Sequence, residues 1–449
     1  MGVFDNTFWN TIHGRIMQNN LEEIPNHLGV HFSPWLFVLV PGYFLFQSSY
    51  YLLFIQTVAL ALGAIPLYYL AERILQKRNW ALGIALAYLL YPSLHWINLF
   101  DFHEISFLVP LLLAAFYFIE IERWGWATLF LIASASTKED AILVVLFVGL
   151  YLLIANTPIS TLWRIRRWRM PDQAKLGLWN KKRLAGVLII LVACLYFLVT
   201  IKILMPAFGG GLLRIDRYSH LGSNATEIVT NLVTNPTLML TTMFSLPKLS
   251  YLLWIFLPVA FLPLLNWRGL ILLIPGLLEN LLTDFTSQFT GLYQYDSVLV
   301  ASIFIGVIFG LKTILERWPS KEKLLERIGI AAVVIGFVMH SPVNPFFFPA
   351  EIFSTNQRWD AYRALVRAVP AEVPVAAHTN LVPHLANREH IAMLGTEKFI
   401  PDIILIDALD GFGFKDSESF QVYVDKYANS GNYEVEILLD RYIVMKKFQ

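Results

Sequence analysis

The sequence predicts a mainly α-helical, polytopic membrane protein: a transmembrane helical bundle with a small α/β domain at its C-terminal end. Of its 449 residues, 56% are hydrophobic and only 15% are charged, against roughly 25% charged residues in an ordinary soluble domain. The mean hydropathy is +0.56, and long apolar runs recur along the chain. Together these values exclude a soluble globular protein, a disordered chain and a fibrous protein.

Charge and cysteine content exclude further classes. The chain has 34 Lys and Arg against 33 Asp and Glu, a net charge of +1, so we expect no nucleic-acid partner. Its single cysteine, Cys194, lies inside an apolar run. One cysteine forms no internal disulfide and no cysteine-based zinc site.

The apolar runs give the expected spans, since a helix that crosses the hydrocarbon core needs about 20 apolar residues. We expect about ten spans, counted over these runs. The long runs are 50–72, 80–99, 105–121, 184–205, 297–316 and 329–348; shorter ones are 250–266, 269–283, 125–136 and 141–156. The run 35–46 contains Pro41 and Gly42, is too short to span, and is expected to be re-entrant or interfacial.

Basic residues orient the spans, because Lys and Arg are enriched in cytoplasmic loops. The strongest cluster is 164–183, and the same side receives Lys77-Arg78, Arg123, Arg268 and 317–327. The chain is therefore expected in the plasma (inner) membrane as a multi-pass protein. The outer side then receives 1–49, 100–104, 137–140, 206–249, 284–296 and everything after about 349. Residues 1–49 lie outside in this scheme, so we expect a further span ahead of residue 1.

The chain divides by composition into a membrane domain, 1–349, and an extracytoplasmic α/β domain, 350–449. Helices are expected at 360–369 and 417–427. Buried strands are expected at the apolar stretches 373–377 and 403–406, and a hairpin at 433–437 with 442–445, where apolar residues alternate. The expected role of this domain is structural, or the positioning of an acceptor.

Three consecutive ionisable residues, Lys138-Glu139-Asp140, interrupt an otherwise apolar stretch. An intramembrane charge costs on the order of 2.5–3.5 kcal/mol, so such residues usually face a wet cavity. The lysine would suit a phosphate as a point-charge donor. The alternative is a capping box from Thr137 to Asp140 at an interfacial turn.

A second polar group, Asp101-Phe102-His103-Glu104, lies between two long spans. Asp101, His103 and Glu104 are candidates for contacts to a polar substrate or for a divalent cation, the one cofactor considered. A helix cap from Asp101 to Glu104 is the third interpretation.

Further candidates lie at the N-terminus and in the loop 206–249. Asp5 is expected at the outer membrane surface, as a general base or to orient an acceptor, with an ordinary interfacial aspartate as the alternative. His31 is expected near the same surface. Arg214 and Arg217 follow the glycines at 209–211 and would clamp a phosphate in a mobile substrate loop, unless this is simply a solvated loop.

These residues fall in motifs that resemble those of a family of predicted bacterial and archaeal membrane proteins of unknown function. The resemblance runs along almost the whole chain. The motifs are Gly2-x-Phe4-Asp5-Asn6, Trp9-Asn10-Thr11-x-His13-Gly14, His31-Phe32-Ser33-Pro34, Tyr91-Pro92-Ser93-x-His95, Asp101-Phe102-His103, Lys138-Glu139-Asp140 and the tail from Val382 to Arg388.

The family is similar in layout to the GT-C glycosyltransferases, multispan enzymes that take sugars from polyprenyl-phosphate carriers at the outer membrane face. This resemblance implies a catalytic acid just after the first span, which maps onto Asp5. It implies a lipid-linked sugar as the partner, held by Lys138 with Glu139 nearby, beside ordinary membrane lipid. The alternative is a transporter, or a non-enzymatic membrane protein that binds lipid or glycan.

Overall fold

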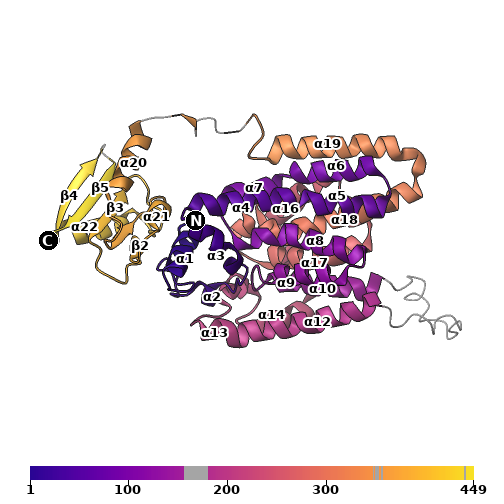
Figure 1. The fold of residues 1–449 in the computed structure, drawn as a ribbon, viewed down its shortest axis with the longest axis horizontal. Coiled ribbons are helices and arrows are strands. Elements are labelled where there is room, and N and C mark those ends of the chain that lie inside the picture. The colour runs from indigo at the N-terminus through magenta and orange to yellow at the C-terminus, as the bar shows by residue number, and fades with distance from the viewer. Residues whose placement is uncertain (156–180, 347, 349–352, 355–356, 439–440, 449) are drawn as a thin grey trace.

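The computed structural model describes all residues except 156–180, 347, 349–352, 355–356, 439–440 and 449. A helical bundle forms the larger part, and the C-terminal domain lies at one end of it (Figure 1). Most of the basic cluster predicted at 164–183 lies outside the described residues.

The bundle begins with short helices and continues with longer ones. Its first half contains α1 (Gly2–Ile12), α2 (His27–Val30), α3 (Leu36–Leu45), α4 (Ser49–Leu62), α5 (Ala64–Leu75), α6 (Arg78–Leu89), α7 (Pro92–Phe100), η1 (Glu104–Phe107), α8 (Leu108–Glu120), α9 (Trp124–Ala135) and α10 (Ala141–Ala155). Its second half contains α12 (Lys181–Val199), η4 (Thr200–Leu204), α13 (Met205–Ala207), η5 (Leu213–Leu221), α14 (Ala225–Thr234), α15 (Pro236–Met243), α16 (Leu246–Phe256), η6 (Leu257–Val259), η7 (Leu262–Leu265), α17 (Trp267–Leu282), η8 (Thr286–Phe289), η9 (Gln294–Asp296), α18 (Ser297–Arg317), η10 (Pro319–Lys321) and α19 (Glu322–His340).

Four helical segments are long and apolar enough to cross a membrane among the described residues: 49–75, 78–100, 181–207 and 294–317. A bent pair, 236–243 with 246–259, would make a fifth, and three shorter apolar helices accompany them. The mainly helical membrane fold is therefore confirmed, whereas the count of about ten spans stays a prediction.

Several expected elements differ in detail. The run 50–72 is divided at Gly63 into α4 and α5, and the run 80–99 is divided before Pro92, which begins α7. Proline has no N–H to donate, so it is tolerated in the first turn of a helix. The stretch 206–249, expected as a loop, is largely helical, with η5, α14 and α15.

The helix α18 forms the centre of the bundle. Most of its residues are buried, and Phe304 packs edge-on against Tyr88 and Tyr91 of the α6–α7 segment. By contrast, α12 lies at the edge and contacts α10 where Gly149 and Gly186 meet; an added Cβ on Gly186 would lie 2.6 Å from the carbonyl oxygen of Gly149. Small residues allow this close helix contact inside a membrane.

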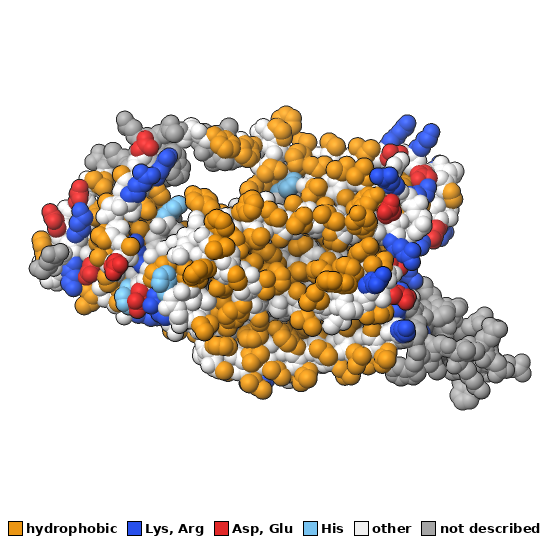
Figure 2. Space-filling view, viewed as in Figure 1, with side chains coloured by type: hydrophobic (Ala, Val, Ile, Leu, Met, Phe, Trp, Pro, Cys, Tyr) orange, Lys and Arg blue, Asp and Glu red, His pale blue; other side chains and the backbone are white. Residues whose placement is uncertain are grey.

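The basic loops gather at one end of the bundle. Lys77 pairs with Glu322 at 2.8 Å, Lys182 lies 3.9 Å from Glu120, and Arg268 donates to the carbonyl of Ala155. Figure 2 shows apolar side chains along the flank of the bundle and Lys and Arg at the end away from the C-terminal domain. The described basic loops therefore lie on one side, as the orientation requires.

The C-terminal domain is a five-stranded mixed sheet with helices beside it. The strand order is β2-β1-β3-β5-β4, with β1 parallel to β2 and β3, and β5 antiparallel to β3 and β4. Its elements are α20 (Gln357–Ala368), β1 (Val375–Ala377), α21 (Val382–Leu385), β2 (Ile391–Met393), β3 (Ile403–Asp407), α22 (Ser417–Ala428), β4 (Tyr433–Leu438) and β5 (Tyr442–Lys447). The expected hairpin, strands and helices are present, and β2 and α21 are additional.

The segment that follows α21 docks onto α1. The buried Asn6 side chain donates to the carbonyls of Ala386 and Arg388, at 2.7 and 2.9 Å. Leu21 and Val3 join the apolar cluster of the C-terminal sheet. The domain is thus fixed to the N-terminal helix at the end of the bundle opposite the basic loops (Figure 1).

Candidate functional site

A cavity of about 620 Å³ lies at the end of the bundle that faces the C-terminal domain. Its wall is formed by α1, α2, η1, the break between α9 and α10, η5, α17 and η9. Seven of the nine residues singled out from the sequence line it: His31, His103, Glu104, Lys138, Glu139, Arg214 and Arg217. Apolar residues such as Leu143, Phe147 and Phe197 line it as well.

The break between α9 and α10 presents Lys138 to this cavity. The lysine pairs with Asp140 at 2.8 Å. Glu139 is engaged elsewhere: its carboxylate pairs with Nδ1 of His31 at 2.9 Å and accepts the backbone N–H of Phe32 at 3.0 Å. The alternative capping box does not form, since the Thr137 hydroxyl donates to the carbonyl of Ser134.

The 101–104 segment contributes two polar atoms without partners. Nδ1 of His103 and Oε2 of Glu104 are buried and meet no described partner at hydrogen-bonding geometry. Burial lowers the pKa of His103 to about 3, so its ring is neutral at pH 7. Both residues line the cavity, and because buried polar atoms normally have partners, we expect a bound ligand to supply them. The predicted cap from Asp101 is also absent, because η1 begins without a side-chain cap.

Two predicted residues lie outside the lining of the cavity. Asp5 is 3% exposed, and its carboxylate accepts a hydrogen bond from the Tyr43 hydroxyl at 2.6 Å. Burial raises the pKa of Asp5 to about 6. The Asp101 carboxylate accepts from the backbone N–H of Phe102 at 2.8 Å and pairs with the Met1 ammonium. The structure therefore separates these two carboxylates from the other seven residues.

The two arginines of η5 differ in environment. Arg214 forms an ion pair with Glu23 at 3.2 Å and is partly exposed. Arg217 stacks on Phe285, with 4.4 Å from its guanidinium carbon to the ring centroid, and donates to Gln288 at 3.3 Å. It forms no ion pair with a described residue, so its charge is available to an anion.

The cavity also contains residues that sequence reasoning missed. Glu279 of α17 and Tyr218 of η5 line it, and the Tyr218 hydroxyl donates to the Glu279 carbonyl at 2.9 Å. Glu22 and the buried His27 line it as an ion pair at 2.9 Å. The available signal for Glu279 was its position as the one charged residue in the apolar run 269–283.

Metal ligation is not preformed here. Among the residues that the structure describes, no group of three or more His, Cys, Asp or Glu side chains is placed to hold a metal ion. A divalent cation thus stays a prediction without a described site.

Two glycines fix η5 against α2. The N–H of Gly211 donates to the carbonyl of Gly29 at 3.1 Å, and an added Cβ on Gly210 would lie 1.8 Å from that same oxygen. We expect Gly210→Ala to push η5 away and to destabilise the protein by about 1–3 kcal/mol. Gly211→Ala is the control, because nothing lies within 4 Å of its added Cβ. Equal melting temperatures of the two variants in detergent would contradict this packing account.

Comparison with solved structures finds the same fold in a distant protein. The crystal structure of ArnT from Cupriavidus metallidurans, bound to undecaprenyl phosphate, matches with a TM-score of 0.51 and 11% identity. The match covers 99% of this chain and 92% of that chain. The likeness is one of fold, and it supports the resemblance to the GT-C layout. A search of curated proteins finds no match.

Comparison with family models agrees with the motifs along the chain. One model, described as a predicted membrane protein, DUF2079, matches residues 1–444. The match includes both the helical bundle and nearly all of the C-terminal domain. The chain therefore belongs to the DUF2079 family of predicted membrane proteins.

Proposed function

We propose that the chain is a membrane glycosyltransferase of GT-C-like type, which transfers a sugar from a polyprenyl-phosphate carrier to an acceptor at the outer membrane face. One observation carries the proposal: a single cavity combines an apolar wall, a lysine, an arginine that forms no ion pair with a described residue, and a carboxylate with an oxygen that has no described partner. The apolar wall suits the chain of a lipid phosphate, the two cations suit its phosphate, and the carboxylate suits an acceptor hydroxyl. The fold, shared with a protein solved with undecaprenyl phosphate, supports it.

The carrier phosphate is assigned to Lys138 and Arg217. Charge-assisted hydrogen bonds to phosphate oxygens are roughly twice as strong as neutral ones. Lys138 reaches the cavity from the break before α10, and Arg217 from η5. Arg214, which is partly exposed, exchanges its pair with Glu23 for the ligand. Glu139 holds His31 and thereby positions the lysine beside it.

The transfer step needs no protein nucleophile. The acceptor hydroxyl oxygen attacks the anomeric carbon, and the bond from that carbon to the phosphate oxygen breaks. The phosphate leaves with the electron pair, stabilised by the two cations. We assign the proton of the hydroxyl to Glu104, because this residue lines the cavity and its buried Oε2 has no described hydrogen-bond partner.

Asp5 is the second candidate for the base, favoured by its raised pKa of about 6. Its carboxylate faces Tyr43 rather than the cavity, so we assign it to anchoring α1. Asp101 is likewise assigned to positioning, since its carboxylate accepts the N–H of Phe102, the residue before the two cavity residues.

Asp5→Asn separates anchoring from catalysis. A carboxyl whose pKa rises from 3.8 to about 6 on folding binds its proton more tightly in the native state. Stability therefore falls as the pH rises through this window, by about 3 kcal/mol in all. We expect the variant to melt higher than wild type near about pH 8, to match it near about pH 4, and to retain transfer. Loss of transfer would move the base to Asp5.

Native mass spectrometry of the detergent-purified protein tests the proposal. We expect a co-purifying polyprenyl phosphate or its glycosylated form, which would also name the donor. The transporter or binding-protein alternative would be favoured by a different result: the protein binds bulk phospholipid alone, and membranes that contain it consume no lipid-linked sugar.

A further inference from the structure

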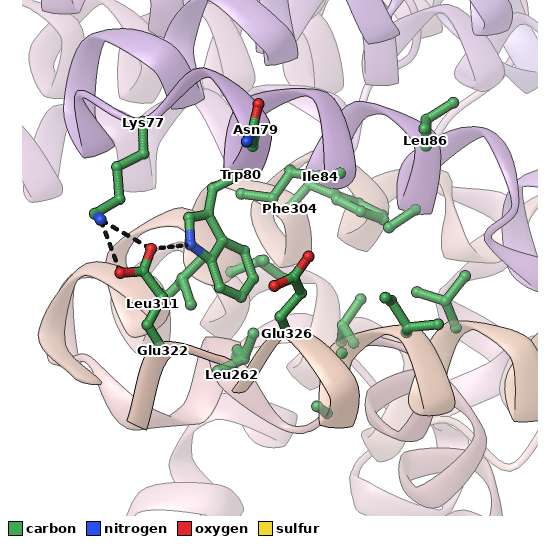
Figure 3. A pocket seen from close by; sticks show the side chains of 18 of the residues that line it. Lys77, Asn79, Trp80, Ile84, Leu86, Leu262, Phe304, Leu311, Glu322 and Glu326 are labelled. Atoms are coloured by element: carbon green, nitrogen blue, oxygen red, sulfur yellow. Dashed lines mark hydrogen bonds and ion pairs between the residues drawn. The ribbon is translucent and has the colours of Figure 1, made fainter. Parts of the chain in front are cut away.

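A second cavity, of about 940 Å³, lies at the basic end of the bundle between α6, α18 and α19. It shares no lining residue with the candidate site. Figure 3 shows Lys77, Trp80, Glu322 and Glu326 at one end of it, and apolar side chains further along.

The cavity exists because α19 contacts the bundle mainly near its two ends. Near the C-terminal end of α19, Gly336 packs on Pro258, and a Cβ added to this glycine would lie 2.6 Å from the proline Cβ. The carbonyl of His340 accepts a hydrogen bond from Trp96 at 2.9 Å. At its start, Glu322 accepts from Lys77 and Trp80, each at 2.8 Å. Between these contacts Ala332 is the one residue of α19 that is buried.

The lining is amphipathic along its length. The charged and amide residues belong to the first turn of α6, the first two turns of α19 and the loops before them, and the large side chains beyond are apolar. The apolar part includes Ile84, Leu86, Leu90, Phe304, Ile330 and Val334. One polar end and a long apolar interior match a membrane lipid lying along a helix.

The length of the cleft matches one leaflet. The helix α6 begins at the polar end of the cleft, and its twelve residues extend about 18 Å along the helix axis. One leaflet of a hydrocarbon core of about 30 Å is about 15 Å deep. A lipid with its headgroup at the polar end therefore has its acyl chain beside the apolar residues.

The charge at the polar end favours an anionic headgroup. Glu322 is neutralised by Lys77. Arg78 and Lys323 remain, against Glu326, and neither cation forms an ion pair with a described residue. Two free cations against one carboxylate attract a phosphate.

We propose that this cleft binds a glycerophospholipid of the leaflet at the basic end, with its phosphate between Arg78 and Lys323 and its acyl chain along α6 and α19. The bound lipid fills the space that the protein leaves between the two helices. The proposal is independent of the transfer reaction.

Two glycines allow a direct test. Gly83 and Gly329 both line the cleft, and nothing lies within 4 Å of an added Cβ on either. Leucine at both positions fills the cleft and favours the helices, since glycine is a poor helix former. Gly125→Leu is the matched control: it lies in α9, with equally open space, outside the cleft.

The measurement is native mass spectrometry after incubation with phosphatidylglycerol in detergent micelles. We expect wild type and Gly125→Leu to retain the lipid, and Gly83→Leu/Gly329→Leu to bind it at least about tenfold more weakly, the loss expected for two methylene groups of burial. Equal retention by all three proteins would overturn the proposal. If the double variant loses a co-purifying polyprenyl phosphate instead of the phospholipid, the cleft belongs to the carrier lipid, and the proposal is overturned as well.

Discussion

Glu104→Gln is expected to lower sugar transfer by about 10²- to 10⁴-fold, the usual contribution of a general base, while lipid binding is retained. Glutamine keeps the size of the side chain but takes no proton. The prediction rests on Glu104 as a lining residue of the cavity, with a buried Oε2 that has no described hydrogen-bond partner. Consumption of the lipid-linked sugar in membranes, followed by mass spectrometry, measures the effect.

The control for this variant is Glu227→Gln in α14. Glu227 is exposed, bonds to Ser223 and does not line the cavity. Transfer by the control is expected to equal wild type. Undiminished transfer by Glu104→Gln would remove this residue from the mechanism.

Lys138→Ala is expected to weaken binding of a polyprenyl phosphate by about 10- to 100-fold, since a hydrogen bond to a charged group contributes about 1.5–3 kcal/mol. The variant also leaves Asp140, the present partner of the lysine, without its ion pair. Lys138→Ala/Asp140→Asn removes this second charge. Binding that stays weak in the double variant assigns the loss to the phosphate contact.

The matched control is Lys202→Ala, an exposed lysine in η4 that does not line the cavity. We expect its affinity for the lipid to equal that of wild type in native mass spectrometry. If binding returns in the double variant, the lysine serves to neutralise Asp140 instead.

The sequence predicted the charged groups of the site better than their neighbours. Lys138-Glu139-Asp140 was recognisable because three charges in an apolar stretch carry a large cost. The partner of Glu139, His31, lies 108 positions earlier in the chain, and no local pattern encodes such a contact. The capping patterns at Thr137 and Asp101 were misleading, because a shift of one residue in the start of a helix is enough to remove a cap.

The fold was predictable as far as composition and apolar runs determine it. Hydropathy gave the membrane bundle, a continuous apolar run gave β3, and alternation gave the β4–β5 hairpin of the C-terminal sheet. The helices inside 206–249 were missed, because their short apolar faces carry no long periodic signal. The approach of Gly210 to Gly29 depends on the packing of η5 against α2, which no local signal reports.

The most direct test of the lipid-phosphate site is a cryo-electron microscopy structure of the protein with added undecaprenyl phosphate. We predict density for the phosphate in the cavity beside η5, within hydrogen-bonding distance of Lys138, with the isoprenoid chain leaving along the apolar wall. A phosphate bound elsewhere, with this cavity empty at saturating lipid, would contradict the account.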